Sequence, residues 1–153
     1  MPLHVVLYQP EIPQNTGNIA RTCAAVGAVL HLIHPLGFYL TDRHLRRAGM
    51  DYWHLVEVHE HASWEAFREA YPDLRLWLTS TRGSRRYVDA DFREGDALVF
   101  GPESRGLPEE LLAAYPGQDL RIPMLPGRRS LNLSSAVAVV VYEAIRQIRP
   151  AWF

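Results

Sequence analysis

The stretch RIPMLPGRRSLNLSSAVAVVVYEAIRQIR, residues 121–149, joins the end of an apolar strand to a polar loop and then to a long apolar helix. The loop contains Pro123, Pro126 and Gly127, and it carries arginine, serine and asparagine side chains into the helix. α/β proteins place ligand sites in such polar loops, between the carboxyl end of a strand and the following helix. The stretch therefore predicts an α/β fold with a ligand site in this loop.

Short apolar runs alternate with helical segments along the rest of the chain. The expected strands are His4–Tyr8, Val29–Ile33, His54–Val58, Leu74–Thr79, Ala97–Phe100 and Leu120–Ile122. The expected helices are Thr16–Val26, Thr41–Ala48, Trp64–Tyr71, Pro108–Ala114 and Ser134–Ile148, with Gly27 and Gly49 as stops and Ser63 as an N-cap. This alternation predicts a mostly parallel sheet flanked by helices on both faces.

The bulk composition fits one compact domain spanning residues 1–153, with 48% hydrophobic residues to form a core. No apolar run reaches the roughly 18–20 residues that cross a membrane, and without a charged n-region or cleavage site the first residues do not suggest export. Cys23 is the only cysteine, so the chain cannot form an internal disulfide. We therefore expect a cytoplasmic protein without membrane association.

The charge is nearly balanced, at −1, but its distribution is uneven, and all sixteen basic residues are arginines. Arginine can grip phosphate bidentately and stack on bases, so clustered arginines allow local nucleic-acid binding. Small arginine clusters are also common on ordinary solvated faces, and the absence of lysine is typical of a genome with a biased base composition. The clusters are Arg43, Arg46 and Arg47; Arg82, Arg85 and Arg86; and Arg121, Arg128 and Arg129.

Several other chemistries lack their sequence patterns. The segment GPESRGLP, residues 101–108, is neither a P-loop nor a dinucleotide fingerprint, because no Gly-Lys-Ser/Thr and no G-x-G-x-x-G is present. The segment His59–His61 has no cysteine or H-E-x-x-H partner, so we expect surface histidines and no metal site. No G-x-S-x-G elbow indicates a serine hydrolase.

Three segments in order resemble the SpoU branch of the SPOUT methyltransferases. They are PEIPQNTGNIAR (residues 10–21), FGPESRGLP (residues 100–108) and the stretch quoted first, so the resemblance covers essentially the whole chain. It implies transfer of a methyl group from S-adenosylmethionine to a ribose 2′-hydroxyl of RNA, without a metal. It also implies a deep trefoil knot formed by the carboxyl-terminal segment, an exception to the rule that chains avoid knots.

The resemblance also implies roles for individual residues. Glu103 would fix the loops of the site, although an acid in a turn is usually just solvated. Residues implied to contact the methyl donor are Thr79, Gly101, Ile122, Met124, Ser130 and Leu131. Residues implied at the catalytic centre are Arg21, Asn15, Ser130 and Asn132.

Each of these residues has an ordinary structural alternative. Ile122 and Leu131 could be core residues, and Ser130 and Asn132 could simply cap the following helix. Arg21 could bind an RNA phosphate and orient the 2′-hydroxyl, or it could act as the general base. The base role meets a physical objection, because a free guanidinium has a pKa above about 12.

The segment GFYLTDRHLRRAGMDYW, residues 37–53, resembles the small members that methylate the wobble nucleotide, cytidine or modified uridine. The expected substrate is therefore a tRNA anticodon stem-loop, held by Arg43–Arg47 and a dimer surface without an added RNA-binding domain. The alternatives are another tRNA or rRNA nucleotide, or a catalytically silent RNA-binding homologue.

The last helix is apolar on two faces. Val137, Val141 and Ala144 belong to one stripe, while Val139 and Tyr142 extend apolar surface around the other side. One chain's core can use only the first face, so we expect a homodimer formed through this helix. The resemblance places the site near that interface.

Overall fold

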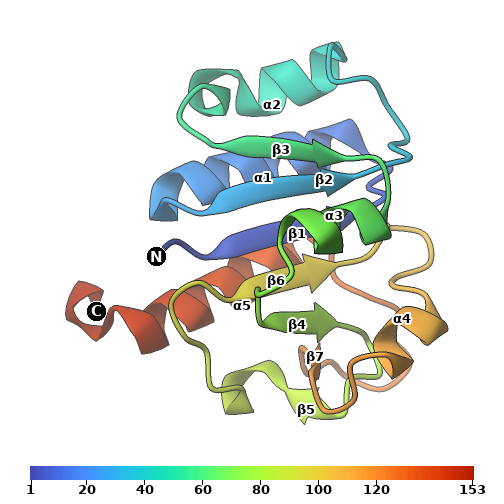
Figure 1. The fold of residues 1–153 in the computed structure, drawn as a ribbon, viewed down its shortest axis with the longest axis vertical. Helices are drawn as coiled ribbons and strands as arrows, with labels where there is room; N and C mark the ends of the chain where they lie inside the picture. Colours follow the sequence, from blue (N-terminus) through green and yellow to red (C-terminus); the bar gives the residue numbers. More distant parts are fainter.

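The computed structural model describes the backbone of residues 1–153 and all side chains except those of residues 49–51. Its centre is a sheet of seven strands in the order β3-β2-β1-β6-β4-β7-β5 (Figure 1). The strands are β1 (His4–Tyr8), β2 (Val29–Ile33), β3 (Val58–His61), β4 (Leu76–Thr79), β5 (Arg85–Arg86), β6 (Ala97–Phe100) and β7 (Asp119–Arg121). All their pairings are parallel, so their carboxyl ends lie along one edge.

Helices cover both faces of this sheet, as predicted. In Figure 1, α3 and α4 lie in front of the sheet, and α1 and α5 lie behind it; α2 packs on α1. The helices are α1 (Pro13–Val26), α2 (Arg43–Trp53), α3 (Trp64–Ala70), α4 (Glu109–Ala113) and α5 (Leu133–Ile148), with 3-10 turns at Tyr87–Asp89 and Pro150–Trp152. None of the helices that the structure describes has both the length and the apolar character needed to span a bilayer.

The alternation of side chains in β1 shows how the two layers form. Val5 and Leu7 join the apolar cluster beneath α1 and α5, whereas Val6 joins the cluster beneath α3 and α4. Successive residues of a strand point to opposite faces, so a continuous apolar run fills both layers. The central strands are consequently buried on both sides, and functional groups are displayed at the strand ends.

Two helix boundaries follow the local signals in the sequence. Gly27 ends α1 with a left-handed φ of 73°, which glycine adopts without steric cost. Ser63 caps α3, because its hydroxyl accepts a hydrogen bond from the amide of Ala66 at 3.1 Å. α1 begins at Pro13, three residues earlier than expected, since proline fits the first turn of a helix.

The region around α2 and β3 differs from the prediction. Gly49 lies inside α2 and does not end it, because Leu45 is buried and Trp53 packs against the core further along the helix. Such packing outweighs the cost of about 1 kcal/mol for an internal glycine. The third strand is consequently Val58–His61 and not His54–Val58. The two-residue strand β5 was not predicted.

His61 is buried, so the expectation of surface histidines at residues 59–61 is wrong for this residue. His31 lies between His4 and His61, and its two ring nitrogens contact theirs at 2.9 Å each. Burial lowers the pKa of His31 to about 3, which keeps this ring neutral at physiological pH. The histidines bond to one another, and no metal-binding group of three or more ligands occurs among the residues with described side chains.

Candidate methyl-donor and RNA site

Three residues predicted to contact the donor lie at neighbouring strand ends. Thr79 is the last residue of β4, Gly101 follows β6, and Ile122 follows β7. Because the sheet order is β6-β4-β7, these positions are side by side at the carboxyl edge. The Thr79 hydroxyl donates to the carbonyl of Val99 at 3.0 Å, which joins the ends of β4 and β6. The fold thus assembles residues that are far apart in the sequence.

Gly101 is required by the loop that it begins. A Cβ at this position would lie 2.3 Å from the amide nitrogen of Leu107 and 2.4 Å from the carbonyl carbon of Gly106. These contacts are with backbone atoms, which cannot move aside cheaply. A larger residue at position 101 would therefore deform the loop itself, in addition to any effect on a ligand.

Glu103 joins this loop to the beginning of α1. Its carboxylate accepts hydrogen bonds from the amides of Glu11 at 2.8 Å and Ile12 at 3.0 Å, and from the side-chain amide of Asn15 at 3.1 Å. Ile12 stands at the N-cap and cannot cap the helix with its own side chain. Glu103 accepts from the two backbone amides just before the helix, and its negative charge is favourable at the positive end of the helix dipole.

A second carboxylate makes the connection reciprocal. Glu11 accepts hydrogen bonds from the Ser104 amide at 2.8 Å and from the Ser104 hydroxyl at 3.0 Å. These bonds, the backbone bond first, lower the pKa of Glu11 below its ordinary value. Arg105 also donates to the side chain of Gln9 at 2.7 Å. We call residues 9–15 and 101–106, joined in this way, the clamped loops.

Asn15, predicted at the catalytic centre, is buried and belongs to the clamped loops through Glu103. Asn132 caps α5, since its side-chain oxygen accepts from the Ser134 amide at 3.0 Å and the Ser134 hydroxyl at 2.6 Å. The alternative that Asn132 caps the following helix is therefore confirmed. These bonds position both residues, and they leave their proposed chemical roles as predictions.

The loop that leads into α5 has a different character. Within residues 123–131, the one backbone hydrogen bond between described residues runs from the Arg128 amide to the Leu125 carbonyl, at 3.3 Å. Leu125 is 69% exposed and Leu131 41% exposed, while Met124 is half-buried. Ile122, just before this segment, packs against the core. We call residues 123–131 the open loop; its apolar side chains and backbone groups are available to a ligand.

Arg21 points toward α2. Its guanidinium carbon lies 4.8 Å from the ring centre of Tyr52, and the side chain is exposed. Among the residues whose side chains the structure describes, it has no hydrogen bond to the clamped loops or the open loop. The fold of one chain therefore brings together three of the predicted donor residues, Thr79, Gly101 and Ile122, but does not join Arg21 to them.

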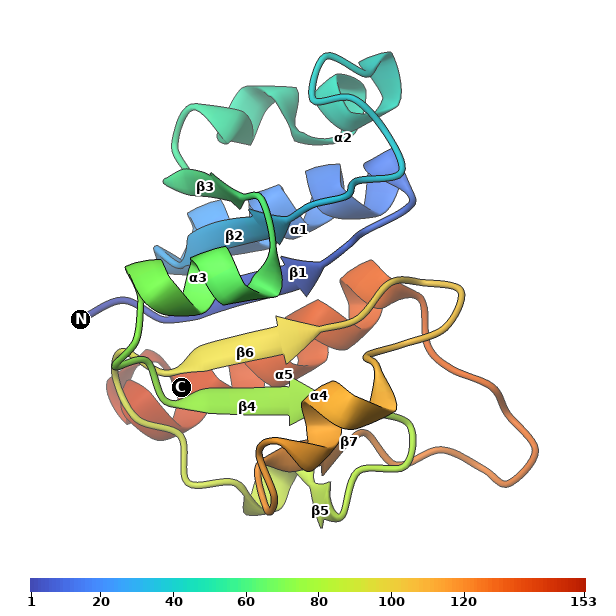
Figure 2. The ribbon, with the colours of Figure 1, turned by 45° about the vertical axis from the view of Figure 1, so that its right-hand side comes forward.

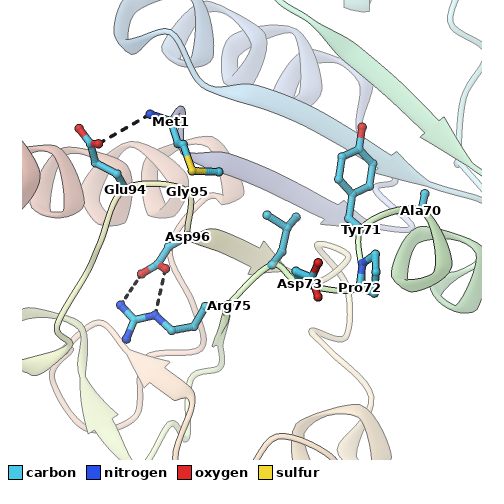
Figure 3. A pocket seen from close by; sticks show the side chains of 10 residues that line it. Met1, Ala70, Tyr71, Pro72, Asp73, Arg75, Glu94, Gly95 and Asp96 are labelled. Atoms are coloured by element: carbon cyan, nitrogen blue, oxygen red, sulfur yellow. Dashed lines mark hydrogen bonds and ion pairs between the residues drawn. The ribbon is translucent and has the colours of Figure 1, made fainter.

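A hollow of about 340 Å³ lies at the opposite, amino edge of the sheet, lined by Met1, Tyr71 and residues near them (Figure 3). Arg75, Asp96 and Glu94, three of its charged side chains, are paired within the protein. Arg75 donates two hydrogen bonds to buried Asp96, at 2.9 and 2.6 Å, and the amino terminus lies 3.6 Å from Glu94. We interpret this hollow as a structural feature, since it contains none of the predicted site residues.

Known proteins resemble the chain over nearly its full length. A protein of Saccharophagus degradans named tRNA (cytidine(34)-2'-O)-methyltransferase is 54% identical, over 95% of each chain. A solved structure concerned with 2-OH methylation of C/U34 on tRNA has 58% identity and a TM-score of 0.91, over 95% of each chain. An AdoMet-bound rRNA methyltransferase from Sinorhizobium meliloti has 30% identity and a TM-score of 0.85, over 95% of this chain and 56% of that one.

The sequence profile of the SpoU rRNA Methylase family matches residues 2–142, which include the clamped loops, the open loop and part of α5. The predicted resemblance is thereby confirmed. With its parallel sheet and three predicted donor residues at adjacent strand ends, the chain belongs to the SpoU rRNA methylase family.

Proposed function

We propose that this protein transfers a methyl group from S-adenosylmethionine to the 2′-hydroxyl of the wobble nucleotide, position 34, of a tRNA anticodon. The observation that carries the proposal is the alignment of Thr79, Gly101 and Ile122 at three adjacent strand ends. It occurs in a chain 54% identical to a protein named for methylation of cytidine 34. We place the reaction in the cytoplasm and assign it to residues 1–153 acting as one domain.

The open loop and the strand ends fit the methyl donor. An adenine ring needs an apolar slot with backbone hydrogen bonds at its edge, and Ile122, Met124 and Leu131 provide apolar surface beside free backbone groups. Gly101 lets the facing loop turn without a side chain, and Ser130 is an exposed hydroxyl on the open loop. When bound, the donor supplies an electrophilic methyl group, and these residues hold it and exclude water.

Arg21 supplies a permanent positive charge for the RNA. Its planar guanidinium can form a bidentate interaction with the phosphate next to the target ribose and orient the 2′-hydroxyl for in-line attack. The clamped loops fix the beginning of α1, the helix that carries this arginine. We assign Ser130 and Asn132 to the same region, where their polar side chains would contact the ribose or the donor.

The outer face of α5 supports a homodimer. Val139 is 36% exposed and Tyr142 is 41% exposed, although the opposite face of the helix is fully buried. A second copy of the chain would cover this apolar surface, and the family resemblance implies a site near that interface. The dimer and Arg43–Arg47 together would hold the tRNA.

The same resemblance implies a deep trefoil knot around the open loop and α5. α5 packs against α1, on the far side of the sheet from α4, although it follows β7 and the open loop (Figure 2). The chain must therefore cross the carboxyl edge between β7 and α5. Tracing residues 119–148 in an experimental electron-density map tests whether this crossing passes through a loop of the chain.

The function is tested with total tRNA from a strain that lacks the enzyme, incubated with the purified protein and labelled S-adenosylmethionine. Mapping of the labelled nucleotide should give 2′-O-methylation at position 34. Methylation at another tRNA or rRNA nucleotide would contradict the assigned position. Donor binding without methyl transfer to any RNA would identify a silent homologue.

A further inference from the structure

Tyr39 is the most exposed large hydrophobic residue recorded among the described side chains. Its relative exposure is 83%, whereas Ile12 nearby in the fold is 43% exposed. Burial of an aromatic ring is favourable, and a ring that is exposed to this extent lacks that stabilisation. Such exposure is either incidental or functional. The surroundings of Tyr39 favour a functional one.

The backbone on both sides of Tyr39 is fixed. Two residues earlier, the Gly37 amide donates to the Pro10 carbonyl at 2.9 Å, and a Cβ at Gly37 would lie 2.8 Å from the Cα of Glu11. Three residues later, the turn closes when the Asp42 amide donates to the Tyr39 carbonyl at 2.9 Å. A ring held on an ordered turn loses little conformational entropy when a ligand stacks on it.

The same contacts place Tyr39 beside the candidate site. Pro10 and Glu11 belong to the clamped loops, which Glu103 and Ser104 join to the end of β6. The connection from β2 to α2 lies at the carboxyl edge of the sheet, as do the loops after β6 and β7 (Figure 2). A ligand that reaches the donor residues from this edge therefore also approaches Tyr39.

Exposed positive charge follows Tyr39 directly. Arg43, Arg46 and Arg47 are all exposed on the first turns of α2. The acid that precedes them, Asp42, accepts from the His44 amide at 2.7 Å and is used as the cap of the helix. Proteins recognise single-stranded nucleic acid with this combination: arginines bind the phosphates of the nucleic-acid backbone, and an aromatic ring beside them stacks on a base.

We propose that Tyr39 stacks on an unpaired base of the RNA substrate while Arg43, Arg46 and Arg47 bind the adjoining phosphates. The inference rests on the proposed function and adds to it a contact that distinguishes an RNA loop from a duplex. The bases of a duplex are stacked on one another, so their faces are closed to a protein ring, whereas loop bases can turn outward. Tyr39 thus contributes to substrate selection outside the donor site.

The test compares Tyr39→Ala with Tyr39→Phe in the full-length protein, with Leu55→Ala as the control. Leu55 is 63% exposed just beyond the other end of α2. The probes are an anticodon stem-loop with 2-aminopurine at successive loop positions, and a fully paired duplex of equal length. Tyr39→Ala should weaken stem-loop binding about ten-fold and abolish quenching of one 2-aminopurine, because a stacked base contributes ~1–3 kcal/mol. Tyr39→Phe should retain both, and Leu55→Ala should resemble the wild type.

Salt dependence separates the ring from the arginines. Tyr39→Ala should leave the slope of log K against log salt concentration unchanged. Arg46→Gln should reduce the magnitude of this slope by about 0.7, because one phosphate contact is lost and fewer counterions are released on binding. Equal losses for stem-loop and duplex, or wild-type binding by Tyr39→Ala, would overturn the inference while leaving the proposed function intact. Failure of the wild type to bind either RNA or to methylate tRNA would instead overturn the proposed function.

Discussion

The clamped loops and the open loop lie at the same edge of the sheet but are held very differently. Carboxylates of Glu103 and Glu11 tie the clamped loops together across about 90 positions of sequence, through five hydrogen bonds. The open loop has one backbone bond between described residues, and it exposes Leu125 and Leu131. The clamped loops therefore form one wall of the candidate site, which is ordered before any ligand binds. The open loop forms the other wall, which gains partners from a ligand.

This difference separates two tasks. A group that must orient a reacting hydroxyl benefits from a support that is already rigid, because a small misplacement slows the reaction. A wall that admits and releases a donor can be less constrained, provided that donor contacts stabilise it. We therefore expect changes near the clamped loops to affect turnover, and changes in the open loop to affect donor binding.

The largest expected effect is that of Arg21→Ala. It should abolish methyl transfer while donor affinity stays within a few-fold, because Arg21 stands on the helix fixed by the clamped loops and has no bond to the open loop. Calorimetry with S-adenosylhomocysteine and methyl-transfer kinetics on the same preparation provide the measurement. Arg21→Lys keeps the charge but loses the fork.

Arg93→Ala serves as the control, because Arg93 pairs with Asp91 at the amino edge, at 3.0 Å. Activity retained by Arg21→Ala would remove the catalytic assignment. A change in donor affinity alone would move Arg21 to the donor site, and the two walls would then not divide the tasks.

Val139→Glu tests whether either wall works without a second subunit. An isolated chain leaves Val139 and Tyr142 in water, at a cost on the order of 1.5–3 kcal/mol per large apolar side chain. The introduced charge should split the proposed dimer, and tRNA methylation should fall in parallel. Light scattering and activity assays on one sample give both values, with Leu55→Glu as an exposed apolar control. A fully active monomer would contradict the packing argument and the shared site together.

Glu103→Ala should break the clamp. Three donors lose their charged acceptor, so the free energy of unfolding should fall by about 1–3 kcal/mol. Urea denaturation measures this loss, and Glu69→Ala, which removes an exposed acid from α3, is the control. Turnover should fall more than donor affinity. An unchanged stability would mean that these hydrogen bonds do not hold the loops.

Local patterns in the sequence predicted five of the seven strands and all five α-helices, most of them with shifted ends. The runs at β1, β2 and β6 are apolar and bounded by loops, so their limits were correct. The Gly49 stop failed because the buried Leu45 and the core-packed Trp53 continue α2. The third strand was predicted too early, at His54–Val58, because the HEH residues of β3 do not read as a strand. The reciprocal bonds of Glu11 and Ser104 join distant positions, and no local pattern encodes them.

Donor binding should sharpen the contrast between the two walls. Amides of residues 123–131 should become more protected from hydrogen exchange when S-adenosylhomocysteine binds, whereas those of residues 9–12 should change little. The experiment is carried out in chelator, since we expect binding without a metal. Loss of binding in chelator would contradict that expectation. Equal protection of both segments would show that the clamped loops are not ordered in advance.

The smallest expected effect concerns Glu11, whose pKa is lowered from its ordinary value of 4.5, first by the Ser104 amide and then by the Ser104 hydroxyl. The charged form is the one favoured in the folded protein. Its contribution to stability is therefore present above pH 4.5 and is lost as the pH falls through the lower folded value. Ser104→Ala removes the hydroxyl but keeps the amide, so the pKa of Glu11 should rise only part of the way.

Carbon-detected NMR titration of the Glu11 carboxyl measures this shift. Ser84→Ala, which removes a hydroxyl from Asp119 instead, should leave the titration of Glu11 unchanged. A Glu11 that titrates at its ordinary value in the wild type would mean that the exposed half of the clamp is open in solution. The loops would then depend on Glu103 alone, and Glu103→Ala would account for the whole of their order.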